Sequence, residues 1–189
     1  MTGTATLEVT GELASGERLL WSGQPRGGIR LTPADAFLIP FSLLWGGFAI
    51  FWEYRVFQTN APFFFRLWGI PFVLMGLYLI VGRFFVDASR RSRTYYGLTD
   101  IRILIIAGSR SRSVTSLELG RLAQLGITEH SDRSGTISFG TYIGPMPGWV
   151  ASSWPGTSKQ LPPRFEMIEN VRTVYNSIRE AQRTYGVTA

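Results

Sequence analysis

The sequence predicts an α+β membrane protein in which a two-helix transmembrane hairpin is joined to a domain with an antiparallel β-sheet and a C-terminal helix. Two uncharged runs predict the hairpin, Ala36–Trp52 and Leu67–Gly82. A third observation predicts the domain, because β-branched and apolar runs separated by turn residues begin at Thr94. We therefore expect an N-terminal segment, the hairpin and the β domain at residues 1–35, 36–86 and 87–189.

Charges bound both uncharged runs at a spacing that suits a bilayer. A helix crosses the hydrocarbon layer with about 17–25 apolar residues. Asp35 and Glu53 lie about 27 Å apart along a helix. Arg66 and Arg83 lie about 26 Å apart by the same rise. In an antiparallel hairpin, Asp35 can pair with Arg83 at one edge of the bilayer. Glu53 can pair with Arg66 at the other edge; alternatively, all four side chains extend to water unpaired.

The helices themselves leave two alternatives open. A pair of buried helices in a soluble core is the alternative to a membrane hairpin, but core helices keep a polar face that these runs lack. Within the first run, Ser42 and Gly46 form a small-xxx-small pair, which permits close approach of two helices. We expect that approach inside the hairpin rather than between two copies of the chain, and a homo-oligomer stays open.

Arginines concentrate on one side of the predicted hairpin. Three precede the first helix and five follow the second, whereas the connecting loop Glu53–Pro62 contains only Arg55. The positive-inside rule therefore places both termini in the cytoplasm. Juxtamembrane arginines also attract anionic lipids, by about 1 kcal/mol each near the surface. The arginines expected to contact such lipids are Arg90, Arg91 and Arg93.

The β domain is expected to contain short strands and one helix. Strands are predicted at residues 94–99, 101–107 and 113–119, a hairpin at 125–130 and 136–142, a long loop at 144–163 and a helix at 164–185. In the second strand, Ile103 and Ile105 share one face and Leu104 and Ile106 share the other. Both faces should therefore be covered, one by the core of the sheet and the other by the terminal helix, the hairpin or a partner.

Four segments carry a resemblance to a known family. One of them is Tyr96-Gly97-Leu98-Thr99-Asp100-Ile101-Arg102-Ile103, and the others are Gly16–Pro25, Gly135–Gly140 and Phe165–Ile178. In their order along the chain, with the two apolar helices between the Gly16 and Tyr96 segments, they resemble the membrane-anchored bacterial pleckstrin-homology (PH)-like domain proteins. The resemblance implies a strongly bent antiparallel sheet capped by a C-terminal helix, no enzymatic activity and no settled ligand.

The composition excludes several kinds of site. The chain has no cysteine and one histidine, His130, which excludes disulfides, thiolate metal sites and multi-histidine metal sites. No glycine-rich motif for phosphate or dinucleotide binding is present. The net charge of +6 is spread along the chain without interleaved aromatic residues, so we expect no nucleic-acid partner. We expect no catalytic residue, cofactor or metal ion.

One turn of the domain is a candidate contact for a lipid headgroup. It follows the second predicted strand and contains Arg110 and Arg112. Basic residues on such a turn can bind a phosphate, and the alternative is a solvated turn with no ligand.

Together these features favour a non-catalytic, multi-pass protein of the bacterial inner membrane. Its PH-like domain is expected to act as a scaffold or regulatory protein-interaction module. The alternative is a small accessory or assembly subunit that docks into a larger membrane complex through the hairpin. The expected partners are the lipid bilayer and other membrane proteins.

Overall fold

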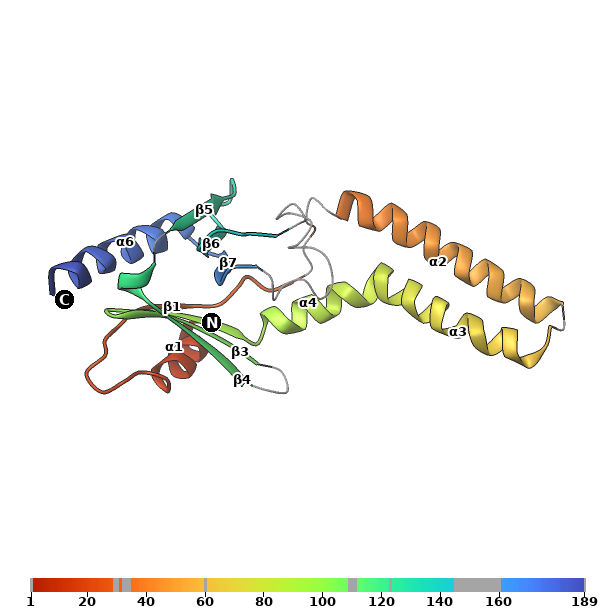
Figure 1. Ribbon diagram of the computed structural model, residues 1–189, viewed down its shortest axis with the longest axis horizontal. Coiled ribbons are helices and arrows are strands. Elements are labelled where there is room, and N and C mark those ends of the chain that lie inside the picture. Colours follow the sequence, from red (N-terminus) through yellow and green to blue (C-terminus); the bar gives the residue numbers. More distant parts are fainter. Residues whose placement is uncertain are drawn as a thin grey trace. The chain divides into compact units, whose positions relative to one another are not determined.

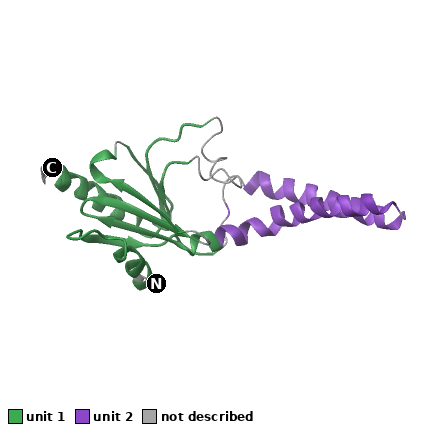
Figure 2. Cartoon of the chain, turned by 60° about the horizontal axis from the view of Figure 1, so that its bottom comes forward, with its two compact units in different colours: residues 1–28, 89–145, 159–189 green, residues 29–88, 146–158 purple. Residues whose placement is uncertain are grey.

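The computed structural model describes residues 2–28, 31, 35–59, 61–108, 112–122, 124–144 and 161–188. The chain forms two compact units (Figure 2). The β unit comprises Met1–Gly28, Ser89–Pro145 and Lys159–Ala189, and the hairpin unit comprises Ile29–Ala88 and Met146–Ser158. The sequence led us to expect a separate N-terminal segment at residues 1–35, but residues 1–28 belong to the β unit. They fold with the β unit because a strand within them pairs with the chain that follows the hairpin.

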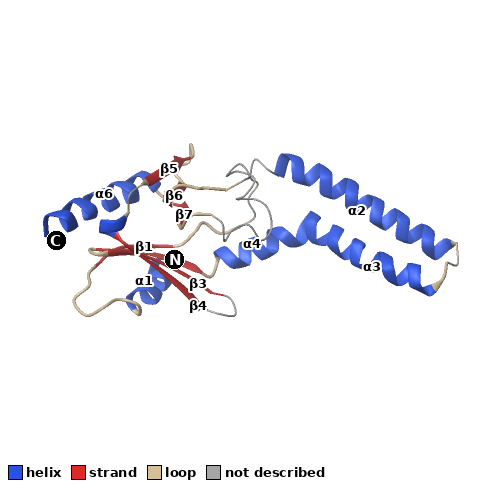
Figure 3. Ribbon diagram, viewed as in Figure 1, coloured by secondary structure: helices blue, strands red, loops and turns tan. Residues whose placement is uncertain are grey.

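The β unit contains two antiparallel sheets and a C-terminal helix (Figures 1 and 3). The first sheet has the order β1 (Leu19–Gly23), β2 (Thr94–Thr99), β3 (Arg102–Gly108) and β4 (Arg112–Glu118). The second has the order β5 (Leu125–Glu129), β6 (Gly135–Phe139) and β7 (Arg164–Ile168). A short 3₁₀ turn, η2 (Leu119–Arg121), follows β4, and α6 (Val171–Thr188) follows β7. The predicted strands of the first sheet and the β5–β6 hairpin are confirmed.

The helix expected at 164–185 begins seven residues later, because its predicted first turn is strand β7. Phe165 pairs with Ile137 and Ile168 pairs with Gly135, so this stretch forms a strand along the edge of β6. Positive φ angles at Met167 (49°) and Asn170 (47°) then turn the chain into α6. The sequence pattern alone could not distinguish a strand from the first turn of a helix here, because Ile137, the partner of Phe165, is almost thirty residues away in the chain. Most of the predicted loop 144–163 lies outside the described residues.

The main core of the β unit lies between the sheets and one face of α6. Its centre is the buried Phe165 ring, whose centroid is 4.6 Å from that of Tyr96, 4.9 Å from that of Phe139 and 5.5 Å from that of Trp21. The helix contributes a buried stripe at positions 171, 174, 178 and 181, the spacing of one helical face. Aromatic contacts of this kind favour tilted and edge-to-face geometry, which fixes the orientation of the Phe165 ring.

The second face of the first sheet is covered by α1 (Thr2–Thr10). Leu104 and Ile106 pack there against Val9, and all three are almost completely buried. The prediction that both faces of β3 are covered is confirmed, but the cover is the N-terminal helix. Gly97 permits the close approach, because a Cβ at this position would lie 2.5 Å from Cγ1 of Val9. This helix was not predicted from the sequence, because its threonines, glycine and valine are weak helix formers.

A buried ion pair holds the chain at the entry to β1. The Glu17 side chain is fully buried, and Arg102 donates to it from Nε and Nη2, each at 2.8 Å. Thr99 Oγ1 and the Ala14 N–H also donate to this carboxylate, each at 2.7 Å. The hydrogen bond from Arg102 is the main cause that lowers the pKa of Glu17 from 4.5 to about 2. The motif residues Thr99 and Arg102 thus serve the fold.

The hairpin unit is built from two long apolar helices. The first is α2 (Asp35–Gln58), and the second runs without a break through α3 (Phe63–Leu77), the π-helix η1 (Tyr78–Gly82) and α4 (Arg83–Arg91). Both are long and apolar enough to cross a membrane. Most of their large apolar side chains are exposed, including Leu44, Phe64 and Leu77 at 60% or more.

Small residues let the two helices touch. Gly46 and Gly76 face each other so closely that a Cβ on Gly76 would lie 2.8 Å from Cα of Gly46. Ser42 and Ala49 of α2 are buried in the same seam. The small-xxx-small pair predicted at Ser42 and Gly46 therefore serves packing inside the hairpin.

Replacing Glu17 with Gln is expected to destabilise the β unit and to remove part of its acid sensitivity. The folded-state pKa lies below the ordinary value, so the stabilisation is complete above about pH 4.5 and is lost as the pH falls towards 2. The shift corresponds to on the order of 3 kcal/mol. Thermal unfolding of the detergent-solubilised chain at pH 7 and pH 3 should show a smaller acid-induced loss in Glu17→Gln. Glu118→Gln, at an exposed pair with Arg121, is the control. Equal acid-induced losses in wild type and Glu17→Gln would contradict the assignment.

Gly76→Ala is expected to force the two helices apart, because its Cβ would collide with the backbone of Gly46. Overpacking of this kind costs about 1–3 kcal/mol. Gly47→Ala is the matched control, because no atom lies within 4 Å of its Cβ. The midpoint of SDS-induced unfolding should fall for Gly76→Ala and stay level or rise for Gly47→Ala. Equal midpoints would show that the helices do not touch at this point.

Candidate functional site

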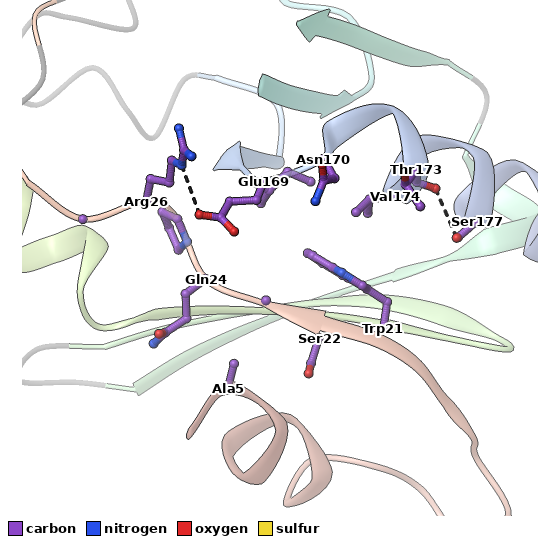
Figure 4. Close-up of a pocket in the computed structure, with 14 residues that line it drawn as sticks. Ala5, Trp21, Ser22, Gln24, Arg26, Glu169, Asn170, Thr173, Val174 and Ser177 are labelled. Atoms are coloured by element: carbon purple, nitrogen blue, oxygen red, sulfur yellow. Dashed lines mark hydrogen bonds and ion pairs between the residues drawn. The ribbon is translucent and has the colours of Figure 1, made fainter. Parts of the chain in front are cut away.

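The β unit contains an open groove of about 500 Å³ (Figure 4). One wall is the chain from Trp21 to Gly27, which comprises the end of β1 and its extension. The other wall is the end of β7 and the first turns of α6, from Ile168 to Ser177. Its volume lies within the range of about 300–1,000 Å³ typical of small-ligand sites.

The floor of the groove is apolar and preformed. Ile168 and Val174 line it and are almost completely buried in the core. The Trp21 indole lies over Gly23, where a Cβ would approach its Cζ2 atom to 2.5 Å. Figure 4 shows this indole extending from β1 towards Val174 of α6. Gly23 therefore provides the space that lets the ring form part of the floor.

Charged groups at one end of the groove hold one another in place. Arg26 Nη1 lies 2.5 Å from Asp132 Oδ2, and Arg26 Nε lies 3.2 Å from Glu169 Oε1. The bond to Glu169 is the main cause that raises the pKa of Arg26. Hydrogen bonds from Ser134 are the main cause that lowers the pKa of Asp132 to about 2. Arg26 and Asp132 are therefore charged at neutral pH.

The same end of the groove is closed by the backbone. The Arg26 N–H donates to the Met167 carbonyl at 3.0 Å, which joins the extension of β1 to β7. On the α6 side, the Asn170 carbonyl accepts from the N–H groups of Thr173 and Val174 at 3.0 and 3.3 Å. The Ser177 hydroxyl donates to the Thr173 carbonyl at 3.1 Å. These bonds fix both walls before any ligand arrives.

This arrangement is suited to binding. Within the described residues, no group of three or more histidine, aspartate or glutamate side chains is placed to hold a metal ion. The groove supplies an apolar floor, hydroxyl and amide groups on its rim, and an ion cluster at one end. It also runs along an edge strand, because β1 has a sheet neighbour on one side only.

The predicted juxtamembrane arginines are placed differently from one another. Arg90 and Arg93 are exposed. Arg91 is 8% exposed, and its Nη2 donates to the Gly28 carbonyl at 2.8 Å. The prediction that Arg91 faces lipid headgroups therefore needs correction. Its side chain instead joins the end of α4 to the chain at Gly28, within the β unit.

The predicted headgroup turn is described only in part. Arg110 lies outside the described residues. Arg112, the first residue of β4, is half-exposed and pairs with Glu12 at 2.9 Å and Glu8 at 3.3 Å. These carboxylates belong to α1 and the turn after it, so Arg112 helps to fasten that helix to the sheet.

The structure contains one of the two predicted hairpin charge pairs. Arg83 Nη2 lies 2.7 Å from Asp35 Oδ1, although it is not aligned as a hydrogen-bond donor. The two side chains are only 10% and 7% exposed. The Arg83 guanidinium also lies 4.5 Å from the centroid of the Phe84 ring. A buried ion pair of this kind fixes the register of the two helices.

The second predicted pair is not formed. Both carboxylate oxygens of Glu53 are buried and accept no hydrogen bond within the described part of the chain. The side chain fills the space left by Gly69, where a Cβ would overlap the carboxylate. Arg66 places its guanidinium 5.6 Å from the centroid of the Phe57 ring. The spacing of charges along the helices could not foresee these local packing choices.

The groove was not predicted from the sequence. None of the predicted site residues lines it, because its two walls are more than 140 residues apart in the chain. Trp21 and Gln24 fall within the Gly16–Pro25 segment, which carries part of the family resemblance. The signal that could have found them is an amphipathic tryptophan on a short strand that is followed by Pro25.

Comparison of the chain with protein-family models, curated proteins and solved structures gave no match.

Exchanging the charges of Asp35 and Arg83 tests whether their pair fixes the hairpin. Asp35→Arg and Arg83→Asp should each lower the stability of the detergent-solubilised chain, by about 3–5 kcal/mol, because each leaves a buried charge without its partner. The double exchange should recover part of that loss. The measurement is the free energy of unfolding in SDS for all four proteins. A double variant whose loss equals the sum of the single losses would show that the pair contributes nothing.

Proposed function

We propose that this chain is a non-catalytic integral membrane protein whose β unit is a protein-interaction module. The observation that carries the proposal is the preformed groove, in which the charged groups pair with one another and leave an apolar floor open. Groups held in this way are suited to recognise a ligand rather than to transfer protons. The expectation from the sequence, a scaffold or regulatory module, agrees with this proposal.

Membrane insertion of the hairpin is supported by its surface. Phe37, Phe41 and Trp45 form a stacked row on α2, and Phe64, Trp68 and Phe72 form a second row on α3. The rows meet where the ring centroids of Trp45 and Phe72 are 6.3 Å apart. A soluble chain rarely exposes so much contiguous apolar surface. Lipid tails would cover it.

A PH-like fold of the β unit is supported by the order of its elements. Four strands form one antiparallel sheet, three form a second, and the closing helix packs its apolar stripe into the core. This arrangement agrees with what the resemblance implies. In this proposal the hairpin is an insertion between the first and second strands, and the domain lies in the cytoplasm of a bacterial cell.

The alternative is an accessory or assembly subunit that docks through its hairpin. The exposed aromatic rows favour it specifically, because they offer a surface for other transmembrane helices as well as for lipid. The two functions predict different effects of variants. Thr173→Trp, which fills the groove, should release a partner of the β unit, whereas Asn176→Trp on the exposed face of α6 should not. Phe48→Ser on the hairpin surface should release a partner that docks in the membrane. Co-purification of the three variants in mild detergent separates the functions.

Single cysteines test the proposed orientation, because the natural chain has none. Thr59→Cys lies at the end of α2 and Asn176→Cys lies on α6, and both positions are exposed. With both termini in the cytoplasm, a membrane-impermeant maleimide added to intact spheroplasts should label Thr59→Cys only. Asn176→Cys should react after the membrane is disrupted. Labelling of Asn176→Cys in intact spheroplasts, with Thr59→Cys protected, would reverse the orientation.

A further inference from the structure

We propose that the groove of the β unit binds an extended peptide segment of a partner protein. The segment would add as a strand to the free edge of β1, with an apolar side chain on the Trp21 floor and a basic side chain beside Glu169. This inference rests on the proposed function and names the ligand class of the same site.

The groove follows the edge of β1 and not one of its faces. Successive residues of a strand point to opposite faces, yet Trp21, Ser22, Gly23 and Gln24 all line the groove. Figure 4 shows Trp21 directed towards α6, while Ser22 and Gln24 are directed towards the side of α1. Only a space alongside the strand can be lined by residues of both faces.

The backbone along this edge is available for pairing. Within the described residues, β1 pairs with β2 alone, and no other backbone hydrogen bond involves Leu19–Gly23. Pro25 has no N–H, and the N–H of Arg26 is used by Met167. Within the groove the free edge therefore runs from Trp21 to Gln24, which is about 13 Å of strand. Strand addition gives affinity through main-chain bonds and specificity through alternate side chains.

The walls of the groove explain how a peptide strand can pair with β1 while uncontrolled pairing of this edge with other chains is prevented. An exposed edge strand is a template for uncontrolled pairing unless it is covered or shielded. Here Thr173 and Ser177 of α6 stand on one side of the edge and Ala5 of α1 stands on the other. The edge thus lies between two helices, an arrangement that favours a single extended segment over a second folded sheet.

Charge at the closed end selects a basic side chain. The carboxylates of Glu169 and Asp132 have side chains that are 69% and 52% exposed, against 36% for Arg26. The cluster pairs two carboxylates with one guanidinium. An acidic ligand residue here would meet repulsion, and a lysine or arginine would meet an acceptor. The apolar floor lies several residues further along the edge.

The test uses fluorescein-labelled peptides and the full-length chain in detergent micelles. The probe is the heptapeptide Thr-Val-Thr-Val-Thr-Lys-Thr, tested together with its reversed sequence because either strand direction satisfies the edge. A matched pair carries Glu in place of Lys. Two further versions are N-methylated at the even or at the odd positions, which blocks one or the other edge of the peptide. Binding is measured by fluorescence polarisation, with empty micelles as the blank.

The expected result is saturable binding of the Lys peptide, weakened about tenfold or more by replacement of Lys with Glu. One of the two N-methylated versions should lose binding and the other should keep it, because only one edge faces β1. Thr173→Trp should abolish binding while Asn176→Trp leaves it within about twofold of wild type. Glu169→Gln, which preserves the shape of the side chain, should reduce the preference for Lys over Glu.

Three outcomes would overturn the proposal. Equal binding of both N-methylated peptides would exclude strand addition, and unchanged binding to Thr173→Trp would exclude the groove. Absence of saturable binding by every peptide would exclude this ligand class. If Thr173→Trp nevertheless releases a protein partner during co-purification, the proposed function survives and only the class of ligand is wrong.

Discussion

The pairing of β1 with β2 is the constraint on which the rest of this structure depends. β1 precedes the hairpin and β2 follows it, so the chain leaves the β unit after Gly28 and must return at Ser89. Both ends of the hairpin therefore belong to one side of any membrane that it crosses. An antiparallel pair of helices is the simplest connection that meets this requirement, and Gly46 and Gly76 allow those helices to touch.

Buried charged side chains join separate segments of the chain within both units. Glu17 and Arg102 hold the entry to β1 against the turn between β2 and β3. Arg91 joins the end of α4 to the carbonyl of Gly28, close to the points where the chain leaves and re-enters the β unit. Asp35 and Arg83 do the same at the base of the hairpin. Burying a charge is costly unless it is paired, so each contact penalises any other register of the segments it joins.

The groove is a consequence of the same topology. Because β1 is the first strand and pairs with β2 alone, it is an edge of the first sheet. β7 is an edge of the second sheet, and the only backbone bond between these edges in the described structure is the one from Arg26 to Met167. The sheets therefore diverge beyond that bond. Trp21, packed against Phe165, fills the base of the opening and leaves its upper part free.

The sequence by itself determined the features whose physical signal is local. Uncharged runs marked α2 and α3, and β-branched and apolar runs between turn residues marked β2 to β6. The spacing of the bounding charges allowed the Asp35–Arg83 pair but did not decide it. Tertiary structure decided what depends on distant partners. Residues 164–168 became a strand because β6 offered an edge, and α1 formed from weak helix formers because the sheet offered an apolar face. Glu53 turned to Gly69 instead of Arg66 because side-chain packing, which spacing does not encode, left room there. The groove belongs to this second class, since its walls meet only when residues 21–27 and 168–177 are brought together by the folded core.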